Sequence, residues 1–258
     1  MKILRILKPF EKIDKSTGSM VVSFWLILLL AFWASLGLGE THLFPTMSQV
    51  WKGFTGLFNE GLVVHIGSSL WLCARAVFIA IIISLVLTYL SSAPIIKPIA
   101  TFISKFRYLP LTGISFYITM LINDARSIQI WILVIFMTTF LTTSLLAMLK
   151  DIPEEDFDHA RSLGYGRWQI LLEVIIKGRF DYVIETIRQN LAIVWMMLVT
   201  VESILAAAGG LGFLIKNSDK LADHGRIVAL QIVILLVGLL LDFTLTFLRK
   251  SLFRYSKI

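Results

Sequence analysis

The residues of this 258-residue sequence whose types could carry a chemical function are polar side chains inside long apolar runs. A charge within an apolar segment of membrane length is costly, so it usually has a function or a partner. Glu202 lies near one end of such a run, and Arg75 lies within another. Three further polar residues stand near the other end of the run that holds Glu202, namely Arg188, Gln189 and Asn190. These positions suit a polar path or gate, or contacts between helices.

The sequence lacks the residue patterns of familiar enzymatic centres. It contains no GxxxxGK[ST] phosphate-binding loop and no HExxH zinc motif. Its four histidines are scattered, and its single cysteine, Cys73, lies in an apolar run. We therefore expect no catalytic residue, no metal site and no cofactor bound by this chain, which argues against an integral-membrane enzyme.

The composition predicts a membrane protein. Hydrophobic residues make up 57% of the chain and charged residues 16%, whereas soluble domains have about 45–50% and about 25%. The net charge is +7, but the basic residues stand at the edges of apolar runs rather than in one patch. We expect contact with membrane lipid and no binding of nucleic acid.

Six apolar runs predict an all-α membrane protein with about six transmembrane helices in one domain, residues 1–258. The third run has only about 14 residues, against the usual ~17–25. We expect the preceding loop to extend it, or other spans to bury it. The predicted spans are Met20–Leu38, Leu62–Leu90, Leu109–Ile122, Ile128–Leu149, Val183–Ala207 and Arg226–Leu248. Between them, residues 39–62 predict a loop with a short helix, and residues 208–225 predict a glycine-containing loop with a tight turn at Gly209, Gly210 and Gly212.

The N-terminal residues 1–19 alternate apolar side chains with lysines and predict a short amphipathic helix on the membrane surface. A cleaved signal peptide is the alternative. Because Met20–Leu38 exceeds the ~7–15 apolar residues of a signal sequence, an uncleaved first span is favoured.

The distribution of Lys and Arg predicts that both termini are cytoplasmic. With the N-terminus inside, the four inner segments hold five, three, five and four basic residues. The outer loops hold only four, with Arg226 at a border. An odd number of spans would place one basic terminus outside.

The segment 150–182 interrupts the apolar pattern with the densest charge in the chain. Pro153 and the acidic residues after it favour a helix start. Phe157, Ala160 and Leu163 would form an apolar stripe, and Gly164 and Gly166 would end the helix. A second amphipathic helix would follow over 167–176, with its apolar residues Trp168, Leu171, Leu172 and Ile175 on one side. A long connector of this kind is more often a docking surface than a plain linker.

These residues resemble the EAA loop of permease subunits of ABC importers, in particular the nitrate, sulfonate and taurine group. The similarity extends over roughly residues 43–250, with two departures inside the loop, where Asp158 and His159 replace Glu and Ala. The segments that carry it are Leu43–Trp51, Asp158–Gly164, Gly210–Ile215 and Gly238–Asp242.

The resemblance implies the fold of a type I ABC importer permease in the bacterial cytoplasmic (inner) membrane. It implies a second permease copy, most simply a homodimer, together with two ABC ATPases that bind ATP and Mg, and an extracytoplasmic binding protein. The ATPase would dock on the cytoplasmic loop 150–182 through Phe157, Asp158, His159, Ala160, Arg161, Leu163 and Gly164. The solute would be a small anion such as a sulfonate, taurine or nitrate.

The translocation path is less defined by the sequence. The resemblance favours Glu202 as a gate or path residue, against a helix–helix hydrogen bond or a dimer contact. Candidates for the inner part of the path are Arg188, Gln189, Asn190, Trp195 and Met196, against lipid-interface and packing roles. A stand-alone secondary transporter or channel is the alternative function, although no internal repeat is evident.

Overall fold

In the part of the chain that the computed structural model describes, residues 14–37 and 44–252, every regular element is helical. The predicted amphipathic helix at 1–19 lies largely outside these residues. Five helices are long and apolar enough to cross a membrane: α2 (Lys15–Gly37), α4 (Leu62–Leu90), α7 (Ala125–Lys150), α10 (Phe180–Ile204) and α12 (His224–Leu252). They correspond to the predicted spans one, two, four, five and six.

The third predicted span is a broken helix. Its apolar part, α6 (Leu111–Leu121), has 11 residues, or about 16 Å, roughly half of the ~30 Å hydrocarbon core. The short helices α5 (Lys97–Lys105) and η1 (Phe106–Tyr108) precede it, and all three pack along α7. The preceding loop therefore extends this span, as expected.

Helices α4 and α7 form the centre of the bundle, and α10 packs against both. Ala76 and Ala80 of α4 have no exposed surface, so that the two helix backbones approach closely. The α7 side of the contact holds fully buried Ile132, Met137 and Leu141. In contrast, none of the apolar stretch of α2 is buried against the rest of the chain.

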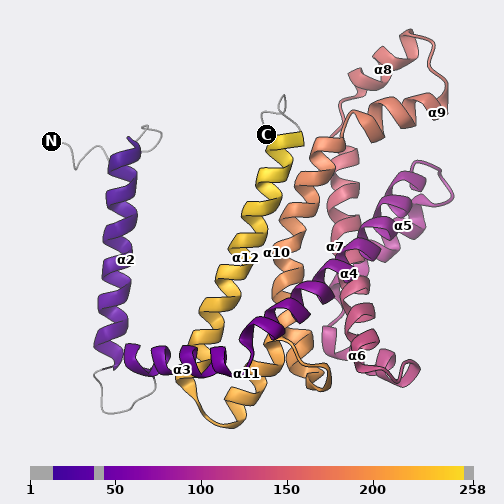
Figure 1. The fold of residues 1–258 in the computed structure, drawn as a ribbon. Helices are drawn as coiled ribbons and strands as arrows, with labels where there is room; N and C mark the ends of the chain where they lie inside the picture. The colour runs from indigo at the N-terminus through magenta and orange to yellow at the C-terminus, as the bar shows by residue number, and fades with distance from the viewer. Residues whose placement is uncertain (1–13, 38–43, 253–258) are drawn as a thin grey trace.

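The two ends of the bundle carry different short helices (Figure 1). The start of α2, the end of α12 and the helices between α7 and α10 lie at one end, and α3 (Met47–Asn59) and α11 (Leu211–Lys220) lie at the other. The sequence predicted a short helix before the second span, which α3 confirms. It predicted only a glycine-containing loop at 208–225, which is wrong because α11 occupies most of it.

Helix α3 crosses the end of α12 at close range. Thr46 caps its start, with a reciprocal hydrogen bond between the Thr46 backbone and the Gln49 side chain. A Cβ atom on Gly53 would lie 2.8 Å from the backbone nitrogen of Arg226. This contact, together with the ion pair from Arg226 to Glu60 at 2.5 Å, fixes α3 across the end of the bundle.

Candidate functional site

The helical segment between α7 and α10 projects beyond the bundle. It consists of α8 (Glu154–Ser162), a turn at Gly164, and a second helix formed by α9 (Arg167–Ile170) and the π-helical η2 (Leu171–Lys177). Figure 1 shows the two arms beyond the ends of α7 and α10. The predicted order of helix, glycine break and helix is confirmed.

The turn at Gly164 depends on a left-handed backbone. Gly164 has φ +80°, a conformation that side chains with a Cβ atom adopt at a cost. Its amide donates to the carbonyl of Arg161 at 2.9 Å, and the Tyr165 amide donates to Ala160 at 3.1 Å. These two bonds close the end of α8 in the way that glycine commonly ends helices. A Cβ atom at Gly164 would meet nothing within 4 Å.

The outer surface of this segment is unusually apolar. Leu163 is 57% exposed and Trp168 is 76% exposed. Tyr165 and Leu172 are also exposed, whereas Ala160 and Ile175 are buried and Phe157 is half-buried. Of the three residues in the predicted apolar stripe, Ala160 and Phe157 thus lie at least partly inside, whereas Leu163 points outward. We call the exposed set of Leu163, Tyr165, Trp168 and Leu172 the apolar tip.

Ion pairs hold the segment in shape around the apolar tip. The Arg161 guanidinium lies 2.6 Å from Asp158 and 3.2 Å from Glu154. These two carboxylates raise the pKa of Arg161 above its usual range, first through the hydrogen bond from Arg161 to Asp158. Arg179, at the start of α10, contacts Asp156 at 3.1 Å. The segment is thus tied both to itself and to α10.

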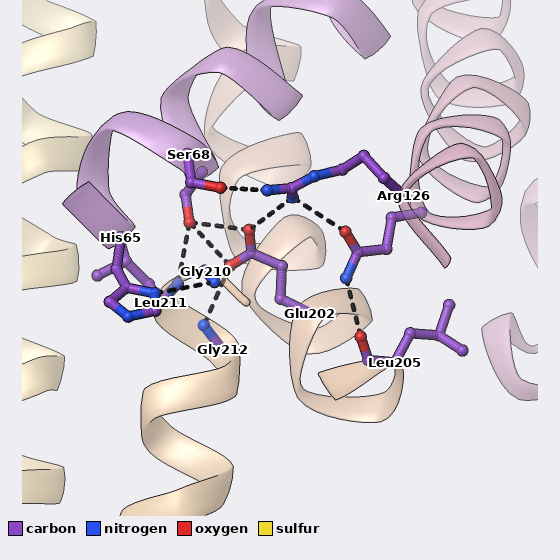
Figure 2. Close-up of polar contacts among 10 residues, drawn as sticks. His65, Ser68, Arg126, Glu202, Leu205, Gly210, Leu211 and Gly212 are labelled. Atoms are coloured by element: carbon purple, nitrogen blue, oxygen red, sulfur yellow. Dashed lines mark hydrogen bonds and ion pairs between the residues drawn. The ribbon is translucent and has the colours of Figure 1, made fainter. Parts of the chain in front are cut away.

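The second polar site is a buried carboxylate at the opposite end of the bundle. Glu202 of α10 has no exposed surface. Both of its oxygens accept from the Ser69 hydroxyl of α4 at 2.8 Å, and the Gly212 amide donates to Oε2 at 3.0 Å. Arg126 of α7 lies 3.8 Å from Oε1. The carboxylate thus links α4, α7 and α11 to α10 (Figure 2).

The glycines of the turn before α11 make room for this carboxylate. Gly210 has φ +105°, and a Cβ atom there would lie 2.1 Å from Glu202 Oε1. A Cβ atom on Gly212 would lie 2.1 Å from the carbonyl oxygen of Val199. The predicted tight turn at these glycines is confirmed, and its physical reason is the approach of α11 to α10.

Several residues of the polar network around Glu202 were not identified from the sequence. His65 accepts from the Gly210 amide at 3.2 Å, and the Gln129 amide donates to the Leu205 carbonyl at 2.9 Å (Figure 2). Arg126 also donates to Ser68 and to Gln129. The spacing of His65 and Ser69, four residues apart in an apolar run, was the available signal that both share one helix face.

A groove of about 570 Å³ lies between α10 and α12. Among the predicted path residues, Arg188, Trp195 and Met196 line it. Gln189 and Asn190 do not: Gln189 donates to Glu185 at 3.0 Å, and buried Asn190 donates to Ser144 of α7 at 3.2 Å. Glu202 also lies outside the groove, which is largely apolar.

One end of the groove carries an ionic cluster between α10 and α12. Arg188 lies 2.6 Å from Glu185 and also pairs with Asp242. Arg249 contacts the second oxygen of Glu185 at 2.5 Å. Arg188 of α10 therefore pairs with a carboxylate on its own helix and with one on α12, and these ion pairs join the two helices. Within the described residues, no group of three His, Cys, Asp or Glu side chains could hold a metal ion.

The sequence is similar to relatives of known name, over most of its length in one case and over less than half in the others. The chain is 27% identical over 253 residues to the taurine transport system permease protein TauC of Escherichia coli (strain K12), covering 94% of this chain and 90% of the relative. It is 28% identical over 129 residues to a putative ABC transporter permease protein of Methanocaldococcus jannaschii, covering 49% and 48%.

A third relative and a solved structure extend this similarity. The bicarbonate transport system permease protein CmpB of Synechococcus elongatus is 24% identical over 106 residues, which are 41% of this chain and 38% of the relative. A chain of the inward-facing MetNI methionine ABC transporter superposes with a TM-score of 0.63 at 15% identity, covering 74% of this chain and 95% of that chain. No family model matches the sequence. The chain is a multi-pass membrane protein with the fold of an ABC importer permease.

Proposed function

We propose that this chain is the membrane-spanning permease subunit of an ATP-driven ABC importer for a small anion in the bacterial inner membrane. The observation that carries the proposal is the projecting helix–Gly164–helix segment with its exposed apolar tip, on a fold shared with an importer permease. The similarity to TauC across 94% of the chain supports the same function.

The projecting segment suits a docking role. Exposed large apolar side chains grouped on a rigid surface are typical of sites that bind a protein partner. Ion pairs on α8 and at the start of α10 hold the apolar tip in place, so little ordering would be required on binding. The partner would be a cytoplasmic ATPase, contacted through the residues from Phe157 to Gly164.

Because the sequence has no phosphate-binding loop, this chain would not hydrolyse ATP itself. ATP and Mg would bind to two partner ATPases, one for each copy in a permease homodimer. An extracytoplasmic binding protein would deliver the solute to the end of the bundle that carries α3 and α11. Both termini would then be cytoplasmic, on the same side as the projecting segment.

The solute is expected to carry an oxyacid group. Two relatives are named for taurine and for bicarbonate, and these solutes present a sulfonate and a carbonate oxyanion.

The direct test is co-expression of the chain with the ATPase and binding protein of its own transport system. We expect the solubilised permease to co-purify with the ATPase, and ATP hydrolysis in nanodiscs to rise when the binding protein is added. A permease that purifies alone and transports solute in liposomes without ATP would contradict the proposal.

A further inference from the structure

Arg75 is an arginine at the middle of a membrane-spanning helix without an acidic partner. It lies 13 residues from the start of α4 and 15 from its end, or about 20 Å from either. Within the described residues it makes no ion pair and no side-chain hydrogen bond, and its one close interaction is with the Trp71 ring, 4.7 Å below the guanidinium. By contrast, Arg126, Arg188 and Arg226 all pair with carboxylates.

The side chain points away from the helices of this chain. Arg75, Trp71 and Phe78 are exposed and lie on one face of α4, whereas Leu72, Cys73 and Ala76 on the opposite side are buried. A guanidinium in hydrocarbon at this depth would be strongly unfavourable. Arg75 lies near the middle of this span, roughly 15 Å from either edge of the hydrocarbon core, so its side chain is too short to reach the membrane surface. This face of α4 must therefore meet water or protein.

The chemistry of the residue favours water and an anion. Its guanidinium has five N–H donors in a planar fork that fits an oxyanion with two hydrogen bonds. The Trp71 ring stabilises the cation from one face through the cation–π interaction and leaves the donors at its edge free.

On this basis, and resting on the proposed function, we propose that Arg75 lines the translocation path and attracts the oxyacid group of the transported anion. Trp71 is a positioning residue that holds the guanidinium in the path. The ligand class is a small oxyanion, such as a sulfonate or bicarbonate.

The test uses the full transporter in membranes and a reactive sulfonate as the probe. Cys73 is the only cysteine, so Cys73→Ala gives a permease background without thiols. Phe78→Cys then places a reporter on the same face of α4 one turn from Arg75. Its labelling rate is measured on the permease chain with the sulfonatoethyl and the trimethylammonioethyl methanethiosulfonates, each normalised to its rate with a free thiol.

We expect Cys at position 78 to react with both reagents. Replacing Arg75 with Gln should lower the anion-to-cation rate ratio by about tenfold, the lower end of the effect of focused charge on encounter rates. Arg75→Lys should retain most of the ratio. As a matched control, Leu221→Cys, exposed at the end of the bundle, should show a ratio that does not depend on residue 75.

Three results would overturn the inference. These are no labelling at position 78, a ratio unchanged by Arg75→Gln, or oxidative cross-linking of two permease chains through position 78 without labelling. Failure of the proposed function is scored separately, as the absence of a complex with the ATPase, because the labelling is measured whether or not the ATPase is bound.

Discussion

Glu202 shows at the residue scale how one carboxylate organises one end of the bundle. It is fully buried, and its oxygens accept from Ser69 and from the Gly212 amide while Arg126 lies 3.8 Å away. Its partners thus come from α4, α7 and the start of α11, three elements that must stay together around α10. A buried carboxylate with this many partners is a structural junction, and any gating role would act through the movement of these helices.

Replacing Glu202 with Gln should destabilise the permease. The glutamine amide has one oxygen that can accept a hydrogen bond and an NH2 group that cannot, so it cannot replace both carboxylate oxygens toward Ser69 and Gly212. Arg126 would also lose its counter-ion. We therefore expect the free energy of unfolding to fall by an amount on the order of 2–3 kcal/mol. The thermal unfolding midpoint of the purified complex measures this loss. Glu173→Gln is the matched control, because Glu173 forms an exposed pair with Lys177 and such pairs contribute about 0–1 kcal/mol. Equal midpoints for the two variants would contradict the junction.

The sequence indicated this site only in part. A charge in an apolar run pointed to Glu202, and the glycines after it pointed to a tight turn. Its partners could not be predicted, because Ser69 and Glu202 are 133 residues apart and only the packing of α4 against α10 brings them together. Likewise, Asn190 and Gln189 are polar in the sequence but contact neighbouring side chains, Ser144 and Glu185, rather than the groove.

At the scale of elements, hydropathy predicted the long helices to within a few residues, because membrane length and apolar composition determine them together. Helix α11 was not predicted, because its polar residues Lys216, Asn217 and Asp219 lower the hydropathy of the segment. The helix is nonetheless amphipathic, with Leu211 and Leu214 buried. The spacing placed Trp168 and Ile175 on one side of the second helix of the projecting segment, but could not show which of them is covered: Ile175 is buried and Trp168 is 76% exposed.

The projecting segment gives the sharpest prediction for an element. Leu163→Glu places a charge on the apolar tip, where no described contact holds Leu163 inside, so we expect normal folding of the permease. Burying that charge against a partner should weaken ATPase binding at least about tenfold, because an unpaired buried charge costs several kcal/mol. Quantitative co-purification with the ATPase measures the change.

Leu221→Glu is the control for this experiment, because Leu221 is similarly exposed, at 65% against 57% for Leu163, but lies at the other end of the bundle. Its co-purification should match that of the unchanged chain. If both variants retained the ATPase equally, the apolar tip would not be the docking surface.

At the scale of the whole molecule, the fold places the start of α2, the end of α12 and the projecting segment at one end (Figure 1). The even number of crossings expected from the sequence agrees with this arrangement, with the broken helix α5–η1–α6 as the third crossing. The prediction that this end is cytoplasmic rests on the distribution of Lys and Arg in the sequence.

This orientation predicts the accessibility of two single cysteines in the Cys73→Ala background. In intact cells, a membrane-impermeant maleimide should label Leu221→Cys, which lies between α11 and α12. It should label Ser162→Cys, in the projecting segment, only after the inner membrane is permeabilised. The reverse pattern would show that the chain is inserted the other way round.

The central claim is that the segment around Gly164 transmits the action of an ATPase to the spans, and Gly164→Val tests it most directly. Gly164 and Gly61 both have positive φ, +80° and +87°, and open space around the position of a Cβ atom. Valine at either position therefore carries the same backbone cost, about 1–2 kcal/mol, at opposite ends of the bundle. The measurement is ATP hydrolysis by the complex in nanodiscs, with and without its binding protein. We predict that Gly61→Val keeps the stimulation by the binding protein and that Gly164→Val loses most of it; full stimulation in Gly164→Val would contradict the account.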